Sequence, residues 1–64
     1  MMQFKVPNMA CSACSDTIAQ AIKAIDPAAT VQADPKTKLV EIETQASETA
    51  IRAAIATAGY TISD

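Results

Sequence analysis

The spacing of hydrophobic residues switches repeatedly between two periods along the 64 residues, and this succession constrains the fold more than any other feature. Segments in which every second residue is apolar predict strands, whereas spacings of three and four predict helices. We expect strands over residues 2–7, 30–34, around Val40 and Ile42, and over 60–62. The helical spacing predicts one helix from about Ala13 to Ile25 and another from Ser47 to Ala58.

Residues with restricted backbones mark the ends of these segments. Pro7 closes the first strand, and Asp26-Pro27 ends the first helix because the residue before proline disfavours the helical region. Ser47 is a favourable N-cap for the second helix, and Gly59 is placed to close it in the left-handed conformation.

The order β-α-β-β-α-β predicts an α+β fold, the ferredoxin-like βαββαβ sandwich. It would have a four-stranded antiparallel sheet with two helices on one face. We expect residues 1–64 to form a single domain, since a chain of this length buries only about 60% of its unfolded surface. The predicted core includes the two helical stripes Ile18, Ala21, Ile22, Ile25 and Ile51, Ala54, Ile55, Ala58.

Charge and hydropathy argue against nucleic-acid binding and against membrane insertion. The net charge is −2 with five Lys and Arg, which is too few for a phosphate-neutralising stripe, so nucleic acid is not expected as a partner. Lys36 and Lys38 are expected to be ordinary surface charges. No apolar run is long enough for direct membrane insertion. The first residues lack the pattern of an export signal, so we expect a cytoplasmic protein.

Cys11 and Cys14 are the strongest candidates for chemistry. The chain contains no histidine, which excludes a histidine general base, a catalytic triad and a zinc site that uses imidazole. In the cytosol, two thiols at this spacing indicate metal binding or redox activity rather than a structural disulfide.

The position of the pair, between a strand and the first turn of a helix, favours thiolates because the helix N-terminus is positively polarised. Thiolates select soft ions such as Cu(I), with Zn(II) and iron–sulfur clusters as competitors. Two ligands are too few for a tetrahedral zinc or iron–sulfur site within one chain. The number of available ligands therefore indicates Cu(I) or another thiophilic ion such as Hg(II).

A dithiol–disulfide redox protein is the alternative from another functional class. Thioredoxin-like motifs follow a strand in a larger α/β domain that supplies a groove for a peptide substrate. This chain is too short for that fold, so we expect a metal-binding protein rather than an enzyme.

The segment Met9-x-Cys11-x-x-Cys14, between a first strand and a first helix, resembles the heavy-metal-associated domain family. Ala58-Gly59-Tyr60 is similar to the Gly-Tyr step that many bacterial members carry. The resemblance covers essentially the whole chain. It implies a free-standing copper metallochaperone of the bacterial or cyanobacterial type, a domain excised from a copper-transporting ATPase, or a mercury-binding protein, and we favour the chaperone.

The resemblance also implies roles for individual residues. Cys11 and Cys14 would ligate one Cu(I). Met9 would pack beneath the loop as a non-ligand, and Tyr60 would lie near the metal and screen it. The other residues expected near the site without ligating are Ala10, Ser12 and Ala13. The family pattern more often has Gly at the position of Asn8 and Thr at that of Ala10.

By the same resemblance, the partner would be the amino-terminal metal-binding domain of a copper P-type ATPase. Copper would pass to it by stepwise thiolate exchange, in which an incoming cysteine first makes the metal three-coordinate. Cys11, nearer the tip of the loop, is expected to engage the partner first. Copper-bridged homodimers are a further expectation, because two exposed thiolates are easily shared.

Overall fold

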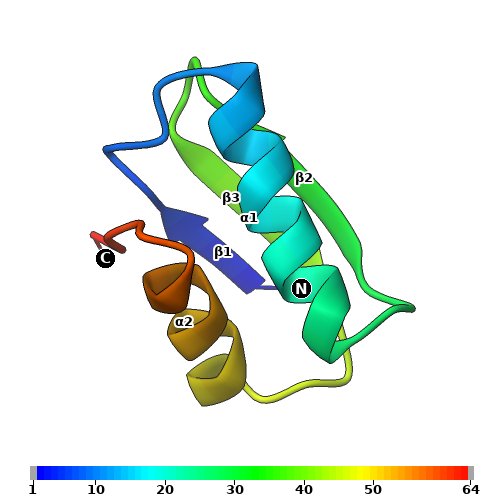
Figure 1. Cartoon of the computed structure of the whole chain (residues 1–64). Coiled ribbons are helices and arrows are strands. Elements are labelled where there is room, and N and C mark those ends of the chain that lie inside the picture. Colours follow the sequence, from blue (N-terminus) through cyan, green and yellow to red (C-terminus); the bar gives the residue numbers. More distant parts are fainter. Residues whose placement is uncertain (1, 64) are drawn as a thin grey trace.

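The computed structural model describes residues 2–63 of the chain. Its helices and strands follow in the order β1 (Met2–Lys5), α1 (Ser12–Ile25), β2 (Thr30–Asp34), β3 (Leu39–Glu43) and α2 (Glu48–Thr57). Both helices cover the same face of the sheet, and the loop between β1 and α1 lies at one end of the molecule (Figure 1). The α+β class and this arrangement of the helices agree with the sequence-based expectation.

The sheet is antiparallel, with β3 in the middle and the order β1-β3-β2. The register pairs Phe4 with Val40 and Gln3 with Glu41. The first pair is buried and the second is exposed, as the alternation of side chains along a strand requires. The hydrophobic pattern of β3 therefore sets which face of the sheet meets the helices.

The predicted fourth strand over residues 60–62 is wrong: the described residues form a three-stranded sheet. The segment meets β1 only through an isolated bridge, in which the Ser63 N–H donates to the Lys5 carbonyl at 2.7 Å. The amides that would begin a ladder have other partners. Tyr60 N–H donates to the Ile55 carbonyl at 3.2 Å, and Thr61 N–H donates to the Asn8 side chain at 3.1 Å.

Helix α1 follows the predicted apolar stripe over most of its length. Ile18 and Ile22 are fully buried. Ile25, which was expected in the core, is instead 46% exposed. It lines a groove with Ala54 and Thr57 of α2 and with Ala58, the C-cap of that helix. The end of α1 is therefore not covered by α2 as the rest of its apolar stripe is covered.

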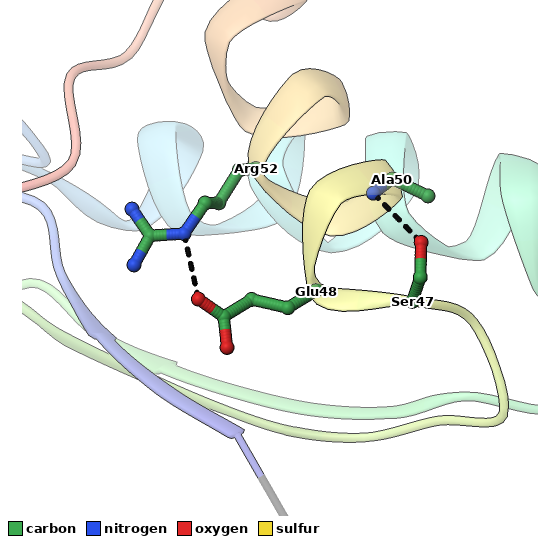
Figure 2. Close-up of polar contacts among 4 residues, drawn as sticks. All are labelled: Ser47, Glu48, Ala50 and Arg52. Carbon is green, nitrogen blue, oxygen red and sulfur yellow. Dashed lines mark hydrogen bonds and ion pairs between the residues drawn. The ribbon is translucent and has the colours of Figure 1, made fainter.

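Helix α2 is capped at both ends as its sequence predicts. The Ser47 hydroxyl accepts from the Ala50 N–H at 3.1 Å, and Glu48 pairs with Arg52 at 2.9 Å (Figure 2). At the other end Gly59 has φ +97°. Its N–H donates to the Ala56 carbonyl, and the next N–H donates to Ile55. These two bonds form a Schellman motif, which fixes the direction in which the chain leaves the helix.

The core lies between the sheet and the two helices. Its buried side chains come from every helix and strand except β2, and from the loops that join them: Phe4, Val6, Met9, Ile18, Ile22, Ala29, Val40, Ile42, Ile51 and Ile55. Val31 and Ala33 of β2 are partly buried and pack against this core. Across residues 2–63 there is no helix with the length and apolar character needed to cross a membrane.

Candidate metal centre

The loop that carries the cysteines is anchored to the rest of the fold before it reaches them. Val6 N–H donates to the Lys38 carbonyl at 2.8 Å, and Met9 N–H donates back to Val6 at 3.0 Å. The Met9 side chain is fully buried, in agreement with the expectation that it packs beneath the loop. These contacts fix the backbone immediately ahead of Cys11.

Lys38 is not an ordinary surface charge, and that expectation is wrong. Its ammonium group donates to the Met9 carbonyl at 2.9 Å, and the residue is half-buried. Its φ of +67° lies in the left-handed region, where residues other than glycine are uncommon. Sequence reasoning missed this contact because it joins residues 29 positions apart, and the only local signal was the preceding turn.

The two sulfur atoms lie together at the start of α1. Cys11 Sγ and Cys14 Sγ are 3.2 Å apart, with Cys11 exposed and Cys14 half-buried. A disulfide bond is about 2.05 Å long, so the cysteines are free thiols in hydrogen-bonding contact. The structure thus brings together the two residues that the sequence singles out.

Several donors converge on the sulfur of Cys14 and lower its pKa from 9.0 to about 7. The largest contribution is the Tyr60 hydroxyl, followed by the Cys11 thiol and the backbone N–H of Ala10, while partial burial opposes them. The same contact, with burial, raises the pKa of the Tyr60 phenol. Near neutral pH, a large share of the Cys14 side chains is therefore the metal-binding thiolate.

The remaining residues expected near the site contribute through their backbone. Ser12 and Ala13 are exposed, and their carbonyls accept hydrogen bonds from the Ser15 and Thr17 hydroxyls at 2.8 and 2.9 Å. Ser15 is buried beneath the first turn of α1, which the sequence analysis did not anticipate. Its polar side chain is satisfied within the turn, so it supports the turn without facing the sulfurs.

The arrangement suits an ion that accepts two sulfur ligands. Within residues 2–63 no cluster of three His, Cys, Asp or Glu is suited to hold a metal. A zinc–sulfur bond is about 2.3 Å long, so two sulfurs on opposite sides of an ion of similar size would lie about 4.6 Å apart. The pair at 3.2 Å would open to reach such an arrangement. The Cys11 side chain is exposed and makes no cap hydrogen bond to α1, so its rotation would break the contact with Cys14 but no cap.

Comparisons with known proteins identify the family of the chain and several similar structures. The model of the heavy-metal-associated domain matches residues 3–61. The copper chaperone Atx1 of Synechocystis, solved as a histidine-to-tyrosine variant in a trimeric copper form, is 40% identical over 98% of this chain and 100% of the other, with a TM-score of 0.94. No curated protein sequence matches the chain.

Two further solved structures are similar over nearly their whole length. A cyanobacterial copper metallochaperone, ScAtx1, is 39% identical over 97% of both chains, with a TM-score of 0.80. A protein described as gold-binding is 40% identical over 97% of this chain and 95% of the other, with a TM-score of 0.92.

Proposed function

The chain belongs to the heavy-metal-associated domain family, and from this membership and the geometry of its cysteines we propose that it is a Cu(I) metallochaperone. One Cu(I) would be held by the thiolates of Cys11 and Cys14, with residues 1–64 acting as a single domain. The observation that carries the proposal is the pair of free sulfurs 3.2 Å apart at the open end of the loop, with the Cys14 pKa lowered to about 7. Soft thiolates and a low ligand count favour Cu(I) over Zn(II).

The similar proteins support a soft metal as the cargo. Two of them are described as copper chaperones and one as gold-binding. We place the activity in the cytoplasm, where thiols such as Cys11 and Cys14 remain reduced.

Delivery would proceed by thiolate exchange with a homologous two-cysteine domain at the amino terminus of a copper P-type ATPase. A partner thiol loses its proton and forms a third Cu–S bond. One Cu–S bond to this chain then breaks, and the released thiolate is free to take up a proton. Copper remains Cu(I) throughout, so no oxidant is needed. Cys11 is the exposed sulfur, which supports its meeting the partner first.

The decisive experiment is an anaerobic Cu(I) titration against a chromogenic chelator, with Zn(II) as competitor. We expect one tightly bound Cu(I) per chain, lost in Cys11→Ser and Cys14→Ser. Met9→Leu is the matched control for the third sulfur of the segment and should bind as the wild type does. Full affinity in either serine variant, or loss of affinity in Met9→Leu, would refute the two-thiolate site.

A second measurement separates the chaperone from its rivals. Mixing the copper-loaded chain with an ATPase metal-binding domain should move copper between them without oxidation of either protein. Catalysed reduction of insulin disulfides by the metal-free chain would favour the redox alternative. Copper-bridged homodimers would show a larger apparent molecular mass in gel filtration when copper is added. The trimeric copper form of the Synechocystis relative supports this test.

A further inference from the structure

The backbone on both sides of Tyr60 is held by hydrogen bonds. Its own N–H is bonded to the Ile55 carbonyl at 3.2 Å within the Schellman motif. The next N–H, that of Thr61, donates to Asn8 Oδ1 at 3.1 Å across 53 positions of sequence. With both peptide groups held, the backbone of Tyr60 is fixed on both sides, and with it the direction of its Cα–Cβ bond.

The Asn8 acceptor itself belongs to a well-anchored part of the metal loop. It precedes Met9, whose side chain is fully buried and whose carbonyl is bound by the Lys38 ammonium group. The backbone that carries the Asn8 carboxamide is therefore fixed from the side of the metal loop. Asn8 and Thr61 are both exposed, so their contact adds little to the hydrophobic core.

We propose that Asn8 is a positioning residue for the site, whose carboxamide holds residues 60–61 against the metal loop and thereby keeps the Tyr60 side chain near Cys14. The effect of this Asn8 contact on copper release rests on the proposed chaperone function. Without the Asn8 contact, the hydrogen bonds described for this segment are those of the Schellman motif and the bridge of Ser63 to Lys5, beside the packing of Tyr60 and Ile62 against the core. Tyr60 would then leave the sulfur more often, and an incoming thiolate would reach the metal more easily.

The first test uses the metal-free protein, so it does not depend on copper binding. In Asn8→Ala we expect the nuclear Overhauser contact between the Tyr60 ring and the Cys14 β-protons to be lost. Hydrogen exchange of the Thr61 amide should rise about fivefold, the factor for one hydrogen bond of ordinary net strength. Asn8→Asp keeps an acceptor oxygen and should restore both signals.

Gln32→Ala removes an exposed carboxamide from β2 and serves as the matched control that leaves both signals unchanged. Retention of the ring contact in Asn8→Ala, or failure of Asn8→Asp to restore it, would overturn the proposal. If Asn8→Ala instead destabilised the whole fold, amide hydrogen exchange would rise throughout the sheet, and the same spectra would measure that rise.

The second test measures the rate at which copper passes from the loaded chain to a dithiol chelator. Asn8→Ala should raise this rate by up to the same fivefold factor, and should add little in a Tyr60→Phe background. Equal rates in Asn8→Ala and wild type would contradict the proposed consequence. A wild-type chain that binds no Cu(I) would refute the chaperone function but leave the result of the metal-free test intact.

Discussion

Tyr60 is the single residue with the largest influence on the reactive thiol. Because its hydroxyl is the main cause of the lowered Cys14 pKa, Tyr60→Phe should move that pKa upward toward 9.0. Alkylation of Cys14, followed by mass spectrometry across pH 5–10, should show a midpoint near 7 in the wild type and a higher one in the variant. Reactivity falls as the pH drops through the midpoint, since the thiol is then protonated. Coincident profiles would show that the phenol does not act on the sulfur.

Lys38 stabilises the metal loop through one charged hydrogen bond. Lys38→Met keeps the length of the side chain but removes the donor to the Met9 carbonyl. Because the contact is half-buried, we expect the free energy of unfolding to fall by about 1 kcal/mol, measured by denaturation with urea. Lys36→Met is the matched control, since that lysine is exposed and should tolerate the change. Equal losses in the two variants would remove any special role for Lys38.

Among the regular elements, α1 has a cysteine at its N-cap, where a helix prefers a hydroxyl or carboxylate. Cys11 has the extended backbone of an N-cap, with φ −151° and ψ 171°, but makes no side-chain cap hydrogen bond. Helix α2, by contrast, is capped by Ser47. The metal ligand therefore occupies a position that stability alone would give to another residue.

We accordingly predict that Cys11→Ser stabilises the metal-free protein while abolishing copper binding. Serine should cap α1 and raise the free energy of unfolding by roughly 0.5–1 kcal/mol, measured by thermal or urea denaturation. Cys14→Ser lies inside the first turn, where no cap is gained, and is the control for thiol loss alone. A Cys11→Ser variant no more stable than Cys14→Ser would contradict the argument.

The elements show where sequence reasoning succeeds. The alternation of Val40 and Ile42 and the helical spacing of Ile18 and Ile22 are local patterns, and the structure confirms all four residues as core. The cysteine pair was likewise found from local spacing. Ile25 was misplaced because its exposure depends on how the last turn of α1 lies against α2, which the spacing within α1 does not encode.

The fourth strand and the loop contacts depend on residues far apart in the chain. The segment after Gly59 alternates like a strand, but the amides of Tyr60 and Thr61 bond to α2 and Asn8 instead of β1, which leaves a single bridge at Ser63. Asn8 and Lys38 reach their partners across 53 and 29 positions. Neither contact leaves a periodic signal in the sequence.

At the scale of the whole molecule, Asp26 links the end of α1 to the loop between β3 and α2 through hydrogen bonds. Its carboxylate accepts hydrogen bonds from the Thr44 hydroxyl and from the N–H groups of Gln45 and Ala28. The Thr44 hydroxyl is the main cause of a pKa below the ordinary 3.8. A depressed pKa means that the carboxylate stabilises the fold fully above pH 3.8, and that this contribution is lost as the pH falls through the lowered value.

Asp26→Asn should remove this part of the acid sensitivity. We expect the unfolding free energy of the wild type to decline more steeply below pH 3.8 than that of the variant, as followed by urea denaturation at a series of pH values. Asp16→Asn, on the exposed face of α1, is the matched control and should follow the wild type. Parallel curves for wild type and Asp26→Asn would rule out this linkage.

The influence of the Tyr60 hydroxyl on the Cys14 sulfur also makes the molecule its own optical reporter. The chain has one tyrosine and no tryptophan, so its ultraviolet emission comes from the ring whose hydroxyl meets the reactive sulfur. Protonation, oxidation or metal loading of that sulfur should each alter the emission. A handover between two proteins could then be timed in a stopped-flow instrument with no dye or label attached.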